Sequence, residues 1–235
     1  MIKRVSQLLG LLLILATGSL TAQESRYTFE KGAYDGIGKW YEGREISHVM
    51  GYQGMYWLER SERETEENTS TLLENMNISK MDAIADIGAG SGYHVFKMAT
   101  MATQGTIYAV DIQEEMLTAM RNKKSRGDFT NVKLIKGSEK SANLKPNSVD
   151  KVLIVDVYHE MNFPYEMMVS IKKAMRPQGK LYLIEYRGED PDVPIKRLHK
   201  MTEAQAVTEM EAVGLILEKN HANLPWQHCM VFVKG

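Results

Sequence analysis

The sequence of 235 residues has one cysteine, Cys229, and almost no net charge. A single cysteine excludes an internal disulfide and any metal site built from a cluster of cysteines. The 29 basic and 30 acidic residues give a formal net charge of −1, which leaves no electrostatic footprint for nucleic acid or an anionic membrane. Repeats and low-complexity segments are also absent. We therefore expect no nucleic-acid partner, and one α/β unit with a sizeable core.

The sequence also lacks an apolar run long enough to span a membrane. The most apolar segment is at the N-terminus. Lys3 and Arg4 are followed by an apolar run over 8–16 and by small residues at 19–22. This order is typical of an export signal and predicts a signal peptide over residues 1–22. An uncleaved anchor is the alternative, but the run is shorter than the ~20 residues that a span needs. We expect an exported bacterial protein, periplasmic or secreted, with no stable membrane span after cleavage.

A glycine-rich turn organises the rest of the chain. The apolar run 83–87 ends in Gly88-x-Gly90-x-Gly92, and a helical pattern follows. The pattern predicts a buried strand, a tight turn and a helix N-terminus whose backbone N–H groups face a ligand. Glycine suits the turn because the backbone needs positive φ and the ligand must come close. Asp86, two residues before the first glycine, repels phosphate but accepts from a cation or an ammonium group.

The spacing of these glycines differs from that of a dinucleotide-binding turn. That fingerprint reads Gly-x-Gly-x-x-Gly, and Tyr93 stands where its third glycine should be. A second apolar run, 106–110, ends at Asp111, which lies 25 residues beyond Asp86. An acidic residue at this place suits a bidentate hold on ribose hydroxyls. The alternative is that Asp86 caps the turn and Asp111 caps the next helix.

Asp-x-Gly-x-Gly-x-Gly with the later Asp111 resembles the S-adenosylmethionine (SAM) site of class I methyltransferases, and the resemblance covers most of the chain after about residue 80. It implies that Asp86 and the turn hold the methionine end of SAM and that Asp111 holds the ribose. Ser138 and Glu139 are implied to flank the adenine, although the family often has an acid at the position of Ser138. The implied cofactor-binding residues are Asp86, Gly88, Ala89, Gly90, Gly92, Asp111, Ile112, Ser138, Glu139 and Asp156.

Residues 45–235 also resemble a narrower group, the exported bacterial methyltransferases. The shared stretches are Met50-Gly51-Tyr52-Gln53-Gly54 and Val157-Tyr158-His159-Glu160.

Strand and helix patterns alternate after the glycine turn and end in a hairpin, as in the family's sheet, whose last strand is antiparallel. The expected fold class is α/β: a Rossmann-like seven-stranded, mostly parallel sheet with helices on both faces and a C-terminal β-hairpin. Expected strands are 83–87, 106–110, 132–135, 149–157, 180–186, 215–218 and 229–233, and expected helices include 114–124, 164–175 and 201–213. Expected domains are a signal peptide over 1–22, an N-terminal aromatic cap and helix over 23–76, and a class I methyltransferase domain over 77–235.

The segment before the glycine turn is aromatic and then highly charged. Residues 23–60 are too apolar for a free linker, so we expect them to pack on the main body and help close the pocket. The charge run 59–67 predicts a surface helix with a solvated face. Candidates for a lid are His48, Tyr52 and Gln53. An aromatic pocket for a small, partly apolar acceptor is expected from Tyr34, Trp40, Tyr158 and Trp226.

A dense set of titratable residues lies at the end of the strand 149–157, where open α/β sheets carry their chemistry. Methyl transfer needs a base only when the acceptor must lose a proton, and His159 is the candidate because its unperturbed pKa lies near working pH. Asp156 and Glu160 are expected to orient it, and Tyr158 to stack on or hydrogen-bond the acceptor. The expected catalytic residues are thus His159, Asp156 and Tyr158. A purely structural His159 is the alternative.

We expect no metal at this site. Asp156, His159, Glu160 and Glu185 are oxygen and nitrogen ligands on neighbouring strand ends. The metal-dependent catechol-type enzymes, however, place Asp-Asn after the fifth strand. That strand ends here in Glu185-Tyr186-Arg187, so the pattern is absent.

The expected function is SAM-dependent methyl transfer to a small-molecule acceptor. A nicotinamide dehydrogenase would share the fold but requires the other glycine spacing and no Asp86. An exported SAM- or nucleoside-binding module without turnover is the second alternative, because SAM is made in the cytosol.

Overall fold

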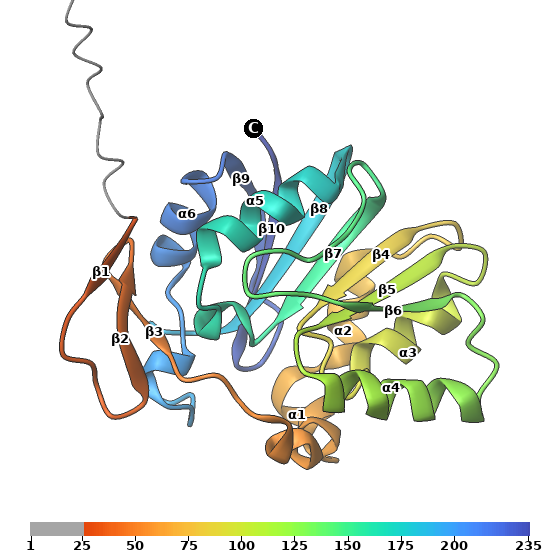
Figure 1. The fold of residues 1–235 in the computed structure, drawn as a ribbon, viewed down its shortest axis with the longest axis horizontal. Helices are drawn as coiled ribbons and strands as arrows, with labels where there is room; N and C mark the ends of the chain where they lie inside the picture. The colour runs from red at the N-terminus through yellow and green to blue at the C-terminus, as the bar shows by residue number, and fades with distance from the viewer. Residues whose placement is uncertain (1–25) are drawn as a thin grey trace, which may run out of the picture.

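A seven-stranded sheet forms the centre of the structure, a computed structural model that describes residues 26–235 (Figure 1). The signal peptide expected over 1–22 lies outside the described residues. The strand order is β6-β5-β4-β7-β8-β10-β9, and β10 is the strand of this sheet that runs opposite to the other six. The strands are β4 (Ala83–Ile87), β5 (Thr106–Asp111), β6 (Val132–Lys136), β7 (Val149–Val155), β8 (Met175–Tyr186), β9 (Leu215–His221) and β10 (Gln227–Lys234).

Helices cover both faces of this sheet. In β4, Ile84 faces one apolar core while Ala85 and Ile87 face the other, because successive side chains of a strand point to opposite faces. The first core is closed by α2 (Thr69–Met76), α3 (Tyr93–Met101) and α4 (Glu114–Arg126), and the second by α5 (Pro164–Ala174) and α6 (Glu203–Glu211). Every residue of β4 is buried, as expected for a central parallel strand. The predicted Rossmann-like α/β fold with its C-terminal hairpin is confirmed.

A small antiparallel sheet precedes this body and was not predicted from the sequence. It consists of β1 (Tyr27–Phe29), β2 (Gly36–Tyr41) and β3 (Arg44–Ser47). Glu42 and Gly43 join β2 to β3, both with positive φ, which is the backbone of a tight type I′ hairpin turn. Such turns favour Asn-Gly or Asp-Gly, so Glu-Gly gives a weak signal in the sequence. β3 contacts two short 3₁₀ turns, η2 (Tyr158–Glu160) and η3 (Arg197–His199).

The charged segment that follows is broken into η1 (Tyr52–Glu59) and α1 (Arg63–Glu67). The expected solvated face is wrong for two of its residues, because Arg63 and Glu67 are 4% and 2% exposed. Nε of Arg63 lies 2.5 Å from Oε2 of Glu67, and Arg60 reaches the other carboxylate oxygen at the same distance. A buried carboxylate needs such partners.

Other boundaries differ by a few residues. β8 begins at Met175, five residues before the expected strand 180–186, and a shift in register between β7 and β8 lies in this added part. Within residues 26–235, none of the helices has the length and apolarity needed to cross a membrane.

Candidate active site

A cavity of about 520 Å³ opens at the carboxyl ends of β4 and β7. The chain order reverses there, because the sheet grows from β4 through β5 and β6 on one side and continues with β7 and β8 on the other. Open α/β sheets bind ligands at such a switch point, and the volume suits a small molecule. The sequence-predicted site residues that line the cavity are Gly88, Gly90, Asp111, Ile112, Ser138, Glu139, Asp156 and His159. Asp86, Ala89, Gly92 and Tyr158 are not in the lining.

The glycine turn brings bare backbone to the cavity. Gly88, Gly90 and Gly92 have φ of +69°, +56° and +81°, a region that residues with a side chain rarely adopt. A Cβ on Gly88 would lie 2.7 Å from Cγ2 of Val157, and one on Gly90 would lie 2.6 Å from Cδ1 of Leu58. The first two glycines therefore permit both the turn and the close packing of Val157 and Leu58 against it.

Asp86 lies beneath this turn with an unsatisfied carboxylate. The side chain is 3% exposed, and its buried Oδ2 has no hydrogen-bond partner among the described residues. Burial raises the pKa of Asp86 to about 7, with the charge of Arg63 opposing the shift and that of Asp111 adding to it. A buried acceptor without a donor is costly. A cationic donor from a ligand would satisfy it.

Asp111 ends β5 beside the turn. Its Oδ2 accepts from the amide of Gly90 at 2.8 Å, and its Oδ1 accepts from the amide of Gln113 at 2.8 Å. Burial raises the pKa of Asp111, although these backbone donors act in the opposite direction. Each oxygen keeps a second acceptor position, which suits the hydroxyls of a ribose.

Arg63 supplies positive charge to the cavity wall, and sequence reasoning did not select it. Its Nη1 donates to the carbonyl oxygen of Leu58 at 2.9 Å, while Nε pairs with Glu67. Its guanidinium carbon lies 4.4 Å from the centre of the Tyr93 ring. This fixed cation suits the carboxylate of an amino-acid ligand. The charge run of the sequence contained the residue but gave no sign of its burial.

Asp156 follows β7 in a strained backbone conformation, with φ of +50°. Its Oδ2 accepts from Nε2 of Gln227 at 2.6 Å, and its buried Oδ1 has no partner among the described residues. Burial raises the pKa of Asp156 well above its usual value, and the neighbouring Glu67 and Glu185 add to the shift. The structure thus places a second unsatisfied carboxylate at the cavity.

Tyr158 does not occupy the position expected from the sequence. It is fully buried in the core, and its hydroxyl donates to Oε2 of Glu209 at 2.8 Å. The predicted contact with an acceptor is corrected on this ground, because the hydroxyl is already used and points away from the cavity.

His159 does lie at the cavity, held by Glu185. Its Nδ1 lies 2.6 Å from Oε2 of Glu185, whose other oxygen accepts from the amides of Tyr158 and His159. Nε2 of His159 lies 3.1 Å from Nδ1 of His199 on η3. Burial acts to lower the pKa of His159, but the charge and hydrogen bond of Glu185 outweigh it and the net shift is upward. For His199, burial and the neighbouring His159 lower the pKa to about 4.

Glu160 stands next to these histidines at the cavity. Its Oε2 accepts from the amide of Met50 at 2.8 Å. Burial raises the pKa of Glu160 to about 7, against the opposing effect of His159. His199 was missed in the sequence because its place depends on how the 187–199 segment folds back over β8.

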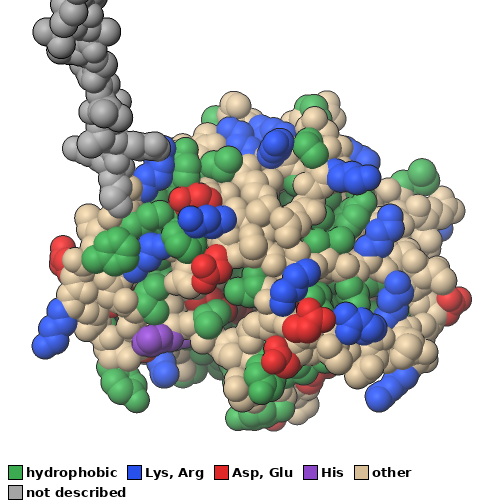
Figure 2. Space-filling model, in the orientation of Figure 1, with side chains coloured by type: hydrophobic (Ala, Val, Ile, Leu, Met, Phe, Trp, Pro, Cys, Tyr) green, Lys and Arg blue, Asp and Glu red, His purple; other side chains and the backbone are tan. Residues whose placement is uncertain are grey.

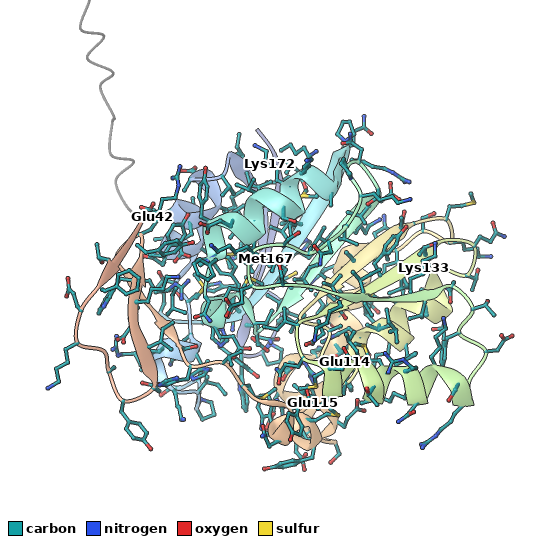
Figure 3. All side chains as sticks on the ribbon, in the orientation of Figure 1. Glu42, Glu114, Glu115, Lys133, Met167 and Lys172 are labelled. Carbon is teal, nitrogen blue, oxygen red and sulfur yellow. The ribbon has the colours of Figure 1, made fainter. Side chains whose placement is uncertain are left out.

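The proposed adenine residues lie at the outer rim. Ser138 and Glu139 follow β6 and are exposed, and Glu139 accepts from Nδ2 of Asn162 at 2.8 Å. Met167 of α5, labelled in Figure 3, also lines the cavity.

The apolar wall comes from residues other than those expected. Tyr34 is 98% exposed, and neither Trp40 nor Trp226 is among the lining residues. The lid candidates His48, Tyr52 and Gln53 are exposed and also lie outside the lining. The wall is instead formed by Val49, Met50, Trp57, Leu58, Met161, Pro194 and Ile195.

A larger hollow of about 770 Å³ lies elsewhere on the molecule, between β8, β9 and the end of α2. Four of its charged side chains form two ion pairs, Arg176 with Asp150 and Lys180 with Glu218. It contains neither the glycine turn nor an unsatisfied buried carboxylate, so the smaller cavity is the better candidate site.

Comparisons with known proteins agree with this geometry. Residues 78–228 match a family described as a methyltransferase domain. "Uncharacterized methyltransferase YdaC" of Bacillus subtilis (strain 168) is 28% identical over 143 residues, which cover 60% of this chain and 76% of that protein. The tRNA U34 carboxymethyltransferase of Pseudoalteromonas translucida (strain TAC 125) is 28% identical over 153 residues, or 63% of this chain, and the match spans only 47% of that protein's length.

Among solved structures, a SAM dependent methyltransferase from Aquifex aeolicus superimposes with a TM-score of 0.73 at 20% identity. The superposition covers 78% of this chain and 98% of that one. At this identity the likeness shows the fold.

Proposed function

The chain belongs to the methyltransferase domain family and is a SAM-dependent methyltransferase, and we propose that it transfers the methyl group to a small-molecule acceptor. The observation that carries the proposal is the largely apolar wall of the cavity, where Met50, Trp57 and Leu58 line the same space as the polar groups of η2. Sites of this kind suit small, partly apolar ligands. Bound SAM supplies a methyl group on a sulfonium, already activated for displacement.

The residues of the site fit SAM in charge and shape. We assign the unsatisfied Asp86 to the ammonium group of the methionine end and Arg63 to its carboxylate. We assign the backbone of Gly88 and Gly90, which lines the cavity, to the methionine end as well, and Asp111 accepts from the ribose hydroxyls. The remaining assignments are Ala89 and Gly92 in the turn, Ile112, Ser138 and Glu139 around the adenine, and Asp156 near the sulfur.

We assign His159 to the acceptor end of the cavity, where it acts as the base. Its Nδ1 is engaged by Glu185, so Nε2, which lies 3.1 Å from Nδ1 of His199, is the nitrogen that receives the proton of an acceptor hydroxyl, thiol or amine. The protein's main contribution to such a displacement is alignment of the two reactants. His159→Ala should therefore slow turnover at least tenfold while S-adenosylhomocysteine (SAH) affinity stays unchanged.

The charge distribution favours a small molecule over RNA. Figure 2 shows basic and acidic side chains interspersed on the face in view, and the chain's net charge is −1. Proteins that bind tRNA need a basic surface to neutralise phosphates. The tRNA-modifying relative shares about half of its length with this chain, so its substrate is not transferred here.

We also propose that residues 23–76 cap the methyltransferase domain of 77–235. The amide of Met50 donates to Glu160, and the carbonyl of Met50 accepts from Nε2 of Gln113 at 3.0 Å. Glu59 accepts from the hydroxyl of Ser91 at 2.5 Å, beside the glycine turn. These contacts join the segment to both ends of the cavity. Export through the signal at 1–22 remains part of the proposal, supported by the sequence pattern alone.

Incubation with isotopically labelled SAM tests the function. The chain is mixed with a small-molecule extract and, separately, with bulk tRNA, and His159→Ala serves as the matched control. We expect label in the small-molecule fraction, reduced in the variant. Label in tRNA would contradict the acceptor class. Tight SAH binding with no labelled product in either fraction would favour a binding module.

A further inference from the structure

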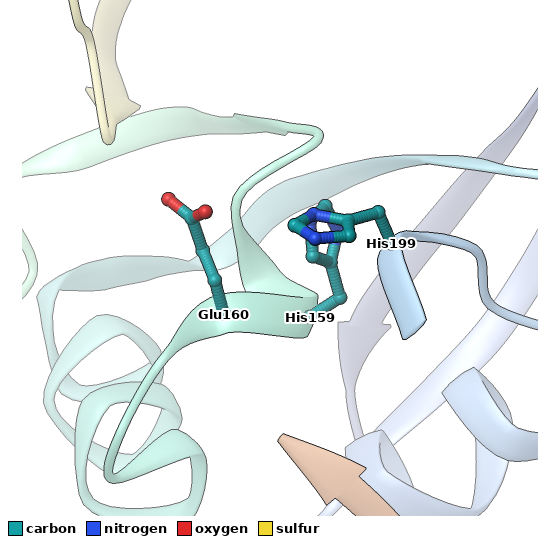
Figure 4. Close-up of side chains that lie close together, drawn as sticks. All are labelled: His159, Glu160 and His199. Atoms are coloured by element: carbon teal, nitrogen blue, oxygen red, sulfur yellow. The ribbon is translucent and has the colours of Figure 1, made fainter. Parts of the chain in front are cut away.

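His159, Glu160 and His199 bring two imidazoles and a carboxylate together at the acceptor end of the cavity (Figure 4). Their ligand atoms all lie within 4.8 Å of one another. The first two residues come from η2 after β7, and His199 comes from η3 after β8. We propose that this cluster binds a divalent transition-metal ion, zinc foremost, through Nε2 of His159, Nδ1 of His199 and the carboxylate of Glu160.

The tautomer of His159 is already set for this role. Glu185 is fully buried and is held by the amides of Tyr158 and His159, so it accepts a hydrogen bond from Nδ1–H of His159 at 2.6 Å. The lone pair of His159 is then on Nε2, the atom that faces His199. A carboxylate behind a histidine is the usual outer support of a zinc ligand.

The separation of the two nitrogens suits a shared ion. Nε2 of His159 and Nδ1 of His199 lie 3.1 Å apart. An ion about 2.0–2.1 Å from each nitrogen would subtend an angle of about 100° between them, near the angles of four- and five-coordinate zinc. Without an ion, the same pair is an ordinary hydrogen bond between neutral rings, which is the competing explanation.

Glu160 offers one oxygen and anchors the other. Oε2 accepts from the amide of Met50, which fixes the carboxylate, while no hydrogen bond to Oε1 is found among residues 26–235. Two histidines and one carboxylate form a set that binds zinc in hydrolytic enzymes and iron(II) in oxygenases.

Acidic side chains also predominate around this cluster. Glu160 and Glu185 are 8% and 0% exposed, and Asp156 lies with Glu160 in the cavity wall. Two buried guanidinium groups are already paired: Arg44 with Glu209, through two bonds of 2.7 and 2.9 Å, and Arg63 of the cavity wall with Glu67. Buried carboxylates keep their charge only beside a positive partner, and a bound cation would supply one.

A bound ion would activate the acceptor of the proposed methyl transfer, so this role rests on the proposed function. Three protein ligands leave a coordination position for an acceptor hydroxyl or thiol, and zinc lowers the pKa of a bound water to about 7. The acceptor would then release its proton to solvent on binding, and Nε2 of His159 would act as a ligand in place of a base. The sequence gave no such expectation because His199 lies 40 residues from His159.

Zinc titration of the chelator-stripped chain, in competition with a chromophoric chelator, tests the inference. We expect one tightly bound zinc per chain. His199→Ala should weaken binding by at least about 100-fold, and Glu185→Gln by about 10–100-fold, as expected for loss of an outer support. His221→Ala, a histidine outside the cavity, is the matched control and should bind like the unaltered chain. The visible spectrum of bound cobalt(II) in the unaltered chain gives a second measurement that needs no variant.

Equal zinc affinity in His199→Ala and the unaltered chain, or no stoichiometric zinc in the unaltered chain, would overturn the inference. SAH calorimetry on the stripped chain separates this failure from that of the proposed function. SAH binding without zinc binding leaves a metal-free methyltransferase with His159 as base, whereas zinc binding without SAH binding counts against the cofactor site.

Discussion

The amide of Gly90 donates to Oδ2 of Asp111 at 2.8 Å, which ties the glycine turn after β4 to the end of β5. The two groups therefore form one rigid unit in the cofactor end of the cavity. Sequence positions 21 residues apart meet because β4 and β5 are parallel neighbours whose carboxyl ends lie at the same edge.

Replacing Asp111 tests the ribose contact. Asp111→Ala should weaken SAH binding by about 1–3 kcal/mol, the scale of lost hydrogen bonds to a charged or buried group. The SAH affinity of Asp111→Asn, which keeps one acceptor oxygen, should lie between those of Asp111→Ala and the unaltered chain. Calorimetry measures both, with the exposed Asp128→Ala as control. Unchanged affinity in Asp111→Ala would remove the residue from the cofactor site.

The pH dependence of SAH binding reports on Asp86. Its pKa is about 7 because burial disfavours the charged form, and a ligand ammonium group requires the ionised form. Affinity should fall by up to about tenfold per pH unit below 7 and level off above it. Glu160 also titrates near 7, so the profile is compared with that of Asp86→Asn, which should bind weakly and with a shallower slope. Identical slopes in the two proteins would contradict the assignment.

The same carboxylate should destabilise the ligand-free protein. The folded pKa of Asp86 is raised from 3.8 to about 7, so the free energy of unfolding falls as pH rises between these values. Asp86→Asn removes the buried charge, and above pH 7 the ligand-free variant should be more stable by roughly 2–3 kcal/mol, at about 1.4 kcal/mol per pKa unit less the cost of the buried amide. Urea denaturation at pH 8 measures this. A less stable variant would mean that Asp86 has a partner in the ligand-free state.

Tyr158→Phe distinguishes a core residue from an acceptor contact. The change removes the hydroxyl bond to Glu209, which keeps Arg44 and Gln205 as donors, so stability should fall by about 1 kcal/mol. Turnover and SAH affinity should match those of the unaltered chain, and the exposed Tyr56→Phe should alter neither property. A large loss of turnover at unchanged stability would restore Tyr158 to the catalytic set.

Export is tested by the N-terminus of the protein made in a Gram-negative host. Mass spectrometry of the periplasmic fraction should show a chain that begins at Gln23. Full-length protein confined to the cytosol would contradict the signal peptide, and full-length protein in the membrane fraction would indicate the uncleaved anchor.

The sheet and its glycine turn were predictable because both depend on local patterns. The apolar run 83–87 and the three glycines sit next to one another in the chain, and the strands after them follow the same order as the family's. Asp111 was likewise visible as an acid at the end of a strand.

The acceptor end was not predictable, because its residues come from distant segments. Arg63 looked like part of a solvated charge run, and only the structure shows that it is buried over the Tyr93 ring in the cavity wall. His199 has no local motif, and its place beside His159 depends on the path of the chain after β8. Tyr158 misled because residues 158–160 form the 3₁₀ turn η2, in which Tyr158 packs into the core while His159 lines the cavity.

A crystal structure of the protein with SAH bound tests the central assignment most directly. We predict the ligand across the carboxyl ends of β4 and β5, with its ammonium group near Asp86, its ribose hydroxyls on Asp111 and its sulfur directed toward η2. SAH in the hollow beside Arg176, or a cavity over β4 that stays free of ligand at saturating concentration, would contradict the account.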